Sequence, residues 1–228
     1  MSGNPVPGKR IGPLPIAILV SGEGTTLDAL AELAANGTLP ARIALVLANR
    51  PGIGALEKAA RRGLSSVVVA SRDAPVDAWS ERVTAELESR GVELVVLAGF
   101  LKILPPSWIE RWKGRVINIH PALLPRYGGH GMYGAHVHEA VLASGDSETG
   151  ATVHLVTTAV DGGLILAQRR IPVLPGDTAE SLRARLHPVE VELLADTIRQ
   201  FADGSLSLPY SERDALGLRR RDDRGPIG

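Results

Sequence analysis

Short apolar runs alternate with segments of helical periodicity along the first half of the chain. The run 16–20 is continuous and apolar, which is typical of a strand buried on both faces, and Leu27, Leu30 and Leu33 then repeat at helical spacing. The alternation continues through a strand at 43–47, a helix at 55–62, a strand at 66–69, a helix at 77–89 and a strand at 94–97. Strands that alternate with helices predict an α/β fold, doubly wound around a mostly parallel sheet.

The pattern changes in the second half of the chain. The sequence predicts, in order, a short helix around 108–112, a strand at 116–120 and a helix at 135–143. Two strands, at 151–157 and 164–173, then follow one another with Asp161-Gly162-Gly163 between them. Strands joined by a short glycine turn favour antiparallel pairing, so the sheet is expected to carry antiparallel edge strands near the C-terminus.

A long helix is predicted to end the fold. Asp177 and Glu180 have the spacing of a capping box at its start, and Gly204 marks its end. Pro188 lies inside this helix and is expected to kink or restart it, because proline lacks the N–H that an interior turn requires.

The patterned part of the chain predicts one domain, residues 16–208. Residues 1–15 carry four prolines and three glycines without periodicity, so they are expected to form a flexible leader. Residues 209–228 are predicted to form a charged, loosely ordered tail. No apolar run approaches the roughly 18 to 20 residues of a membrane span, and no signal peptide is evident, so a cytoplasmic protein is expected.

Composition narrows the classes of function. The chain has 228 residues, of which 44% are hydrophobic and 22% charged, as in ordinary globular proteins. Its 25 basic and 25 acidic side chains cancel, so no nucleic-acid partner is expected. The absence of cysteine excludes disulfides, thiolate metal sites and a cysteine nucleophile.

A glycine loop follows the first expected strand. The segment Ser21-Gly22-Glu23-Gly24-Thr25-Thr26 leads from that strand into a helix, an arrangement that directs free N–H groups and the positive end of a helix at an anion. It matches neither the Walker motif nor the dinucleotide fingerprint, which leaves a phosphate monoester site or a plain tight turn. Glu23 would repel a phosphate if it pointed inward.

The candidate catalytic residues lie where strands end. Asn118 and His120 are two apart and therefore face the same side at the carboxyl end of a strand, where open α/β sheets build ligand crevices. Asp161 follows another strand. A nearby carboxylate orients imidazole and raises its pKa above about 6.5, which suits a general acid, and an amide can donate to a developing oxyanion.

This trio suits acyl transfer to an amine without a covalent intermediate, because no serine or cysteine occupies a nucleophile elbow. Simpler interpretations remain open at this point. Asn118 and His120 can satisfy loop backbone, and Asp161 can serve only as a turn residue before two glycines.

The remaining histidines do not predict a metal site. His136 and His138 are two apart at an expected helix start, where they would point in different directions, and His130 adds no i, i+4 spacing. His154 falls in the middle of a strand, which favours a histidine with satisfied hydrogen bonds in the core or behind the site.

Six ordered pieces resemble the phosphoribosylglycinamide formyltransferase family, folate-dependent enzymes of purine synthesis. They run from about Ile16 to Gly204 and occur in the family's order. The pieces are Val20-Ser21-Gly22 with Gly24, Ala98-Gly99-Phe100-Leu101-Lys102-Ile103-Leu104, Asn118-Ile119-His120-Pro121-Ala122-Leu123-Leu124-Pro125, Gly150-Ala151-Thr152-Val153-His154, Asp161-Gly162-Gly163 and Phe201-Ala202-Asp203-Gly204.

The resemblance implies transfer of a formyl group from 10-formyltetrahydrofolate, the cosubstrate, to the amine of glycinamide ribonucleotide. It implies that His120 is the general acid, that Asn118 holds and polarises the formyl oxygen, and that Asp161 keeps the histidine protonated. His154 would support them from behind. A metal is not implied, and a monomer or homodimer is expected.

The resemblance also implies two binding regions. The folate would contact Asn118 and two backbone stretches, which are Leu101, Lys102, Ile103 and Leu104, and Thr157, Thr158, Ala159, Val160 and Asp161. The nucleotide phosphate would lie on Gly24, Thr25 and Thr26. The segment from His187 to Glu190 would meet the ribose and phosphate.

Some positions depart from the family. Glu23, Thr25 and Thr26 stand where asparagine, serine and asparagine are frequent, and His187 replaces a frequent glutamine. The loop from Gly128 to Gly134 is longer than the commoner Pro-Gly version, so the nucleotide end of the cleft is expected to be shaped differently. Arg72 does not align with an arginine that some relatives use.

Related activities stay open as alternatives. They are a formyltetrahydrofolate hydrolase, a formyltransferase acting on a sugar nucleotide, and a folate- or nucleotide-binding protein without activity. A transferase acting on tRNA is disfavoured, because the extra C-terminal domain and basic surface of such enzymes are not expected here.

Overall fold

The computed structural model describes residues 12–70 and 75–206 and contains one seven-stranded sheet of order β3-β2-β1-β4-β5-β6-β7. Neighbouring strands from β3 to β5 are parallel, and β6 and β7 are antiparallel. The strands are β1 (Leu14–Val20), β2 (Ala41–Ala48), β3 (Ser66–Val68), β4 (Leu94–Leu97), β5 (Val116–His120), β6 (Glu148–Leu155) and β7 (Ile165–Pro172). The predicted mostly parallel sheet with antiparallel edge strands is confirmed.

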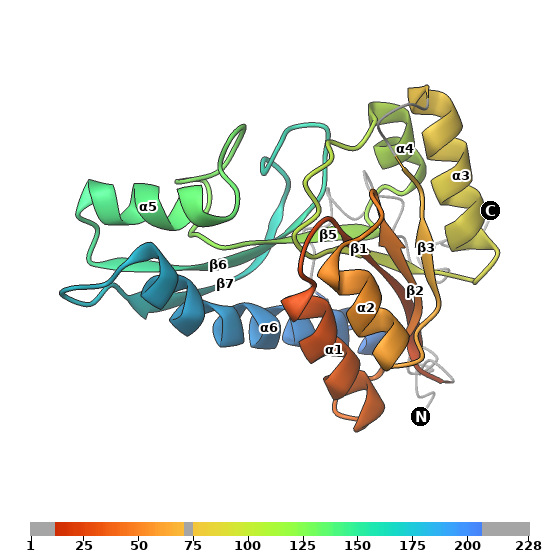
Figure 1. Cartoon of the computed structure of the whole chain (residues 1–228), viewed down its shortest axis with the longest axis horizontal. Helices are drawn as coiled ribbons and strands as arrows, with labels where there is room; N and C mark the ends of the chain where they lie inside the picture. The colour runs from red at the N-terminus through yellow and green to blue at the C-terminus, as the bar shows by residue number, and fades with distance from the viewer. Residues whose placement is uncertain (1–11, 71–74, 207–228) are drawn as a thin grey trace, which may run out of the picture.

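Helices cover both faces of the sheet (Figure 1). They are α1 (Thr25–Ala35), α2 (Gly54–Arg61), α3 (Val76–Glu88), α4 (Pro106–Arg111), α5 (Ala135–Ser144) and α6 (Ala179–Asp203). One apolar cluster joins α1, α2 and α6 to the sheet, and a second joins α3 and α4 to the opposite face. The β6–β7 ribbon extends away from the other strands, with α5 beside it (Figure 1).

Strand β1 shows why the central strands are apolar throughout. Ile16, Ile18 and Val20 belong to the cluster under α1, α2 and α6. Ala17 and Leu19 belong to the cluster under α3 and α4. Because successive side chains point to opposite faces, a strand covered on both sides needs apolar residues at every position.

Element boundaries differ from the sequence prediction in two notable places. β1 begins at Leu14, inside the predicted leader, because Leu14 donates to the carbonyl of Pro40 and pairs with Ala41. The strands β6 and β7 are joined by residues 156–164, a loop longer than the predicted glycine turn. The rest of the leader, the tail 209–228 and Arg72 lie outside the described residues.

The capping box of α6 differs from the one that the sequence predicts. Its capping box consists of Thr178, which accepts from the N–H of Ser181, and Ser181, which accepts from the N–H of Thr178. Asp177 instead accepts from the Leu174 N–H before the helix. Pro188 lies inside α6 without restarting it, and its side chain is exposed on the helix surface.

The sheet order decides where the functional loops meet. Strands β1, β4 and β5 are neighbours and run parallel, so the loops after their carboxyl ends share one edge of the sheet. Those loops carry the glycine segment, residues 98–104 and the residues after His120.

Among residues 12–70 and 75–206, no helix combines the length and the apolar character that a membrane crossing needs.

Candidate active site

A cleft of about 810 Å³ opens at this edge of the sheet, within the usual size range of small-molecule sites. It brings together nearly all of the candidate site residues. The residues that line it are Gly24, Thr25, Thr26, Leu101, Lys102, Ile103, Leu104, Asn118, His120, His154, Thr157, Thr158, Val160, Asp161, His187 and Glu190.

Ala159 is the one predicted site residue that does not line the cleft. Its carbonyl accepts hydrogen bonds from the N–H of Gly162 and from the Thr157 hydroxyl, so it forms the internal turn of the loop between β6 and β7. Ala159 is exposed between Thr158 and Val160, which do line the cleft, and its folate contact stays a prediction.

Asn118 is held by a partner directly across the sheet. The antiparallel register of β5 and β6 sets it opposite His154, and its Nδ2 lies 3.0 Å from Nε2 of that histidine. Nδ1 of His154 lies 2.9 Å from the carbonyl of Leu155, which only accepts, so Nδ1 carries the proton. Nε2 then accepts one N–H of Asn118, and the second N–H remains for another acceptor.

His120 makes one hydrogen bond, at Nε2, and faces a carboxylate at Nδ1. Its Nε2 lies 2.7 Å from the carbonyl oxygen of Tyr127 and must therefore donate to it. Its Nδ1 lies 3.6 Å from Oδ2 of Asp161, longer than a hydrogen bond but close enough for charge interaction. The ring is buried, with 3% of the residue exposed. Of the two ring nitrogens, Nδ1 lies on the side of Asp161 and Nε2 on the side of Tyr127.

The expected rise in the pKa of His120 is wrong for the protein without ligands. Burial lowers its pKa, and the positive charge of a protonated His154 would lower it further. Asp161 and the carbonyl of Tyr127 raise the pKa without compensating fully, so the net direction is down. The free protein thus favours a neutral ring with its proton on Nε2 and a lone pair on Nδ1.

Asp161 connects three separate segments around the histidines. Its Oδ2 accepts from the N–H of Gly129 at 3.0 Å, and its Oδ1 lies 3.5 Å from Nε2 of His154. Burial raises its pKa, but the positive charge of His154 or His120 when protonated and the N–H of Gly129 outweigh burial, so the pKa lies below the ordinary value. The carboxylate is therefore ionised at neutral pH.

The backbone of residues 101–104 is tied to the glycine loop. Ser21 accepts the N–H of Leu101 on its hydroxyl at 2.9 Å, and its own N–H donates to Gly99. Arg50 donates twice to the carbonyl of Ser21, at 3.0 and 2.7 Å. Leu101 and Ile103 leave 54% and 62% of their surface exposed within the cleft, which provides an apolar shelf.

The glycine loop leaves the start of α1 open. Gly24 is its N-cap, with φ of 69°, and no side chain caps the first N–H groups. The exposed Glu23 carboxylate lies over Gly54 at the start of α2, where a Cβ would meet its Oε2 at 2.5 Å. Glu23 lines the edge of the cleft but its charge is drawn toward a second helix start, which reduces the predicted repulsion of an anion.

Helix α6 supplies the opposite wall. Nε2 of His187 lies 3.4 Å from the hydroxyl of Thr26, and Glu190 follows one turn later. Burial raises the pKa of Glu190 to about 7, although Arg183 lowers it. Burial and Arg183 both lower the pKa of His187. The predicted nucleotide residues of α1 and α6 thus face one another.

Sequence reasoning missed three residues of this site. Tyr127 acts through its backbone carbonyl, which no side-chain pattern reveals. His138 is buried at the cleft with no hydrogen-bond partner on Nδ1, whereas His136 is exposed, as their spacing predicted. Arg183 lies one turn before His187, and its i, i+4 relation to that residue was a usable signal.

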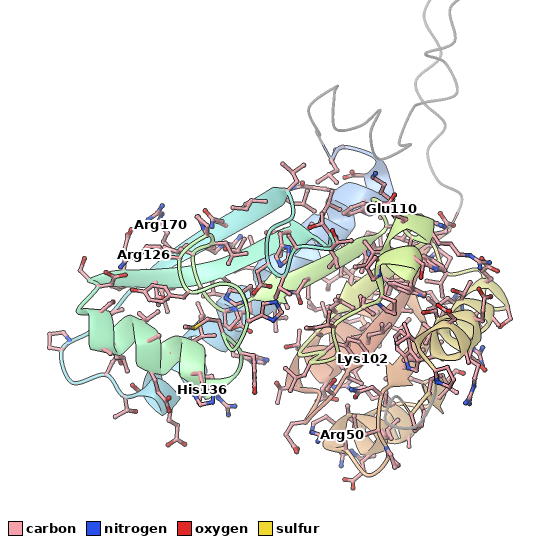
Figure 2. The ribbon with its side chains drawn as sticks, turned by 90° about the horizontal axis from the view of Figure 1, so that it is seen from above. Arg50, Lys102, Glu110, Arg126, His136 and Arg170 are labelled. Atoms are coloured by element: carbon pink, nitrogen blue, oxygen red, sulfur yellow. The ribbon has the colours of Figure 1, made fainter. Side chains whose placement is uncertain are left out.

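Charged residues lie on both halves of the molecule, and of the four named next only Lys102 lines the cleft. Arg50 and Lys102 belong to the half that contains β1 to β4, and Arg126 and His136 belong to the half with α5, β6 and β7 (Figure 2). Within residues 12–70 and 75–206, no three histidine, aspartate or glutamate side chains form a cluster that could bind a metal ion.

Known proteins share this architecture and sequence. The formyl transferase family model matches residues 14–198. The chain is 35% identical to phosphoribosylglycinamide formyltransferase of Haemophilus influenzae, over 85% of this chain and 89% of that protein. It is 34% identical to glycinamide ribonucleotide transformylase 1 of Symbiobacterium toebii, whose crystal structure superposes with a TM-score of 0.81 over 87% of this chain and 92% of that one.

Longer relatives contain the same region. The trifunctional purine biosynthetic protein adenosine-3 of Drosophila pseudoobscura pseudoobscura is 38% identical over 84% of this chain, which spans 14% of the length of that protein. The single-function relatives are matched over nearly their whole length. This chain therefore belongs to the formyl transferase family, in the group formed by the phosphoribosylglycinamide formyltransferases.

Proposed function

We propose that this protein transfers the formyl group of 10-formyltetrahydrofolate to the amine of glycinamide ribonucleotide in purine biosynthesis. The observation that carries the proposal is the convergence of Asn118, His120 and Asp161 in one cleft, which also contains an apolar shelf and an uncapped helix start. The two ends of the cleft suit chemically different substrates, and the three polar side chains lie where the substrates would meet.

The shelf end suits the folate. Leu101 and Ile103 offer apolar surface for a flat ring system, and backbone groups of 101–104 and of the loop 157–161 can bind its polar edge. The α1 end suits the ribonucleotide. Its phosphate would accept from the N–H groups of Thr25 and Thr26, while His187 and Glu190 would contact the ribose and phosphate side.

Asn118 and His120 supply the chemistry. The free N–H of Asn118 would donate to the formyl oxygen as the amine attacks and negative charge develops there. Neutral His120 would take the proton that the attacking amine loses, on Nδ1. It would return that proton to the folate nitrogen as the bond from this nitrogen to the formyl carbon breaks. His120 thus acts as general acid in the second half of the reaction.

Asp161 would stabilise the proton while His120 carries it. Its ionised carboxylate lies 3.6 Å from Nδ1 in the free protein, so the imidazolium would form beside a negative charge. This arrangement replaces the expectation of a histidine that is protonated from the start. His154 supports the reaction indirectly by fixing the amide of Asn118.

Deformylation of 10-formyltetrahydrofolate by the purified protein, followed by absorbance with and without glycinamide ribonucleotide, tests the function. We expect turnover that requires the ribonucleotide. Turnover with water alone would make the protein a hydrolase. If neither reaction occurs while a sugar-nucleotide amine is formylated, the proposed acceptor is wrong.

The variants His120→Ala and Asp161→Ala test the roles of the residues. Both should lose turnover and keep folate binding, measured by calorimetry. His136→Ala is the matched control, because that histidine is exposed outside the cleft. Full turnover by His120→Ala would refute its assignment. A cytoplasmic location and a monomeric or homodimeric state remain predictions from the sequence.

A further inference from the structure

Two residues beside His120 have an unusual backbone conformation. Among the non-glycine residues of 12–70 and 75–206, Tyr127 and Asp161 have positive φ, at 57° and 53°. Aspartate enters this region at modest cost, but a tyrosine has no local side-chain bond to compensate, and the conformation costs about 1 kcal/mol or more. Something in the tertiary structure must therefore hold Tyr127 in place.

The conformation aims the backbone of this segment at the catalytic pair. The carbonyl of Tyr127 accepts from Nε2 of His120 at 2.7 Å, and two residues later the N–H of Gly129 donates to Oδ2 of Asp161 at 3.0 Å. Gly128 between them packs closely on Leu124, since a Cβ there would lie 2.5 Å from a terminal methyl of that side chain. One short segment thus holds both His120 and Asp161.

The side chain of Tyr127 is anchored outside the cleft. Its hydroxyl donates to Oδ2 of Asp146 at 2.6 Å and lies 2.5 Å from the hydroxyl of Ser144, at the junction of α5 and β6. Arg126 pairs with the same carboxylate at 2.9 Å and lies 5.1 Å over the tyrosine ring. The hydroxyl of Tyr127 holds the pKa of Asp146 below its ordinary value, so the acceptor is a carboxylate.

We propose that Tyr127 is a positioning residue for the reaction. The hydrogen bond from its hydroxyl to Asp146 holds the backbone of Tyr127 so that its carbonyl accepts from Nε2 of His120, and this leaves Nδ1 of His120 directed toward the cleft. The catalytic consequence rests on the proposed function, whereas the hydrogen bond to His120 does not. Asp146 binds the side chain of Tyr127, whereas His120 binds its backbone carbonyl. A change at Asp146 therefore reaches His120 through the backbone of Tyr127.

Other groups around His120 do not provide this restraint. Asp161 from the β6–β7 loop and His154 from β6 act on its charge, and His138 from α5 interacts with it electrostatically. Only the carbonyl of Tyr127, among the described residues, makes a hydrogen bond of normal length to the ring. Loss of that bond would free the ring to rotate and would equalise its two neutral tautomers.

The test compares Tyr127→Phe, Asp146→Ala and the double variant. Each single change removes one end of the anchor without touching the cleft. The matched control is Glu148→Ala, which removes a surface carboxylate two residues away that pairs with Arg170. Nitrogen NMR of the imidazole in the ligand-free protein reports the His120 tautomer and pKa, and steady-state kinetics report kcat and KM.

We expect Tyr127→Phe and Asp146→Ala to move His120 from the Nε2–H tautomer toward a mixture and to lower its pKa, because an acceptor for its protonated form is lost. We expect kcat to fall about threefold to tenfold, the usual range for one hydrogen bond, with KM unchanged for both substrates. The double variant should be no worse than either single variant. Glu148→Ala should resemble the parent protein.

An unchanged His120 tautomer and pKa in both single variants would overturn the proposal, provided that their unfolding temperatures show a folded protein. Additive losses of kcat in the double variant would also overturn it. These outcomes are separate from failure of the proposed function. If His120→Ala keeps full turnover, the catalytic assignment fails, and the NMR comparison still decides whether Tyr127 anchors the ring.

Discussion

Asn118 and His154 form a cross-strand pair in which Nδ2 of the amide lies 3.0 Å from Nε2 of the imidazole. The bond from Nδ1 of His154 to the carbonyl of Leu155 makes Nε2 an acceptor. These two hydrogen bonds fix the orientation of the Asn118 amide, with its nitrogen rather than its oxygen beside His154. It leaves one N–H of Asn118 for the formyl oxygen and gives a buried strand histidine a definite task.

His154→Phe should therefore reduce kcat through Asn118. Phenylalanine fills similar volume but offers no acceptor, so the amide is free to flip and present its oxygen to the developing negative charge. We expect kcat to fall about tenfold to a hundredfold, less than in Asn118→Ala, because removal of one oxyanion donor costs about 10²- to 10³-fold. Steady-state kinetics check this. Equal losses in the two variants would show that His154 does more than orient the amide.

Asp161→Asn should separate charge from shape. Asparagine tolerates the φ of 53° at this position and keeps an acceptor for the N–H of Gly129. Without the negative charge, the pKa of His120 should fall further and kcat should drop by about tenfold or more, since about 1.4 kcal/mol of stabilisation corresponds to a factor of ten. NMR titration and kinetics measure the two effects, and an unshifted His120 would contradict the interpretation.

Glu190 should make stability depend on pH near neutrality. Its pKa is about 7 in the folded protein against an ordinary 4.5, so the folded state binds more protons than the unfolded state between these values. Its contribution to stability is full below about pH 4.5 and is lost as the pH rises through 7. Glu190→Gln should raise the unfolding temperature at pH 8, change it little at pH 4.5, and raise KM for the ribonucleotide.

Three histidines whose pKa is lowered by burial act in the opposite direction. The pKa values of His120, His138 and His187 are lowered on folding, so the unfolded state binds more protons below about pH 6.5. Their contribution to stability is present above that pH and lost as the pH falls. Unfolding curves of the parent protein and Glu190→Gln between pH 4.5 and 8 separate the two trends. A Glu190→Gln variant destabilised at pH 8 would refute the raised pKa.

Gly24→Ala should weaken both packing and nucleotide binding. A Cβ at this position would lie 2.6 Å from that of Ala55, and the φ of 69° is strained for alanine. Gly37→Ala is the matched control, because its φ is +78° but nothing lies within 4 Å of its Cβ.

The control should lose about 1 kcal/mol from backbone strain alone, and Gly24→Ala should lose about 1 to 3 kcal/mol more from the clash. Each kcal/mol corresponds to a fall of about 2 to 4 °C in unfolding temperature. Only Gly24→Ala should raise KM for the ribonucleotide. Equal unfolding temperatures for the two variants would contradict the close contact between α1 and α2.

Much of the candidate site was predictable because its signals are local. The spacing of Asn118 and His120 places them on one face of any strand, and a glycine loop between a strand and a helix exposes backbone N–H groups wherever it occurs. Two predictions that depended on local capping and turn chemistry were wrong. Thr178 rather than Asp177 caps α6, and a loop rather than a tight turn joins β6 to β7.

The sequence by itself determined the element types, the parallel core with an antiparallel edge, and the identity of the polar residues at the strand ends. Only the tertiary structure decided that His154 faces Asn118, because register depends on pairing between distant strands. It also decided the protonation of His120, because burial of the ring outweighs the nearby carboxylate. Tyr127 contacts His120 through its backbone carbonyl. Every residue has such a carbonyl, so only the folded structure shows which one binds His120.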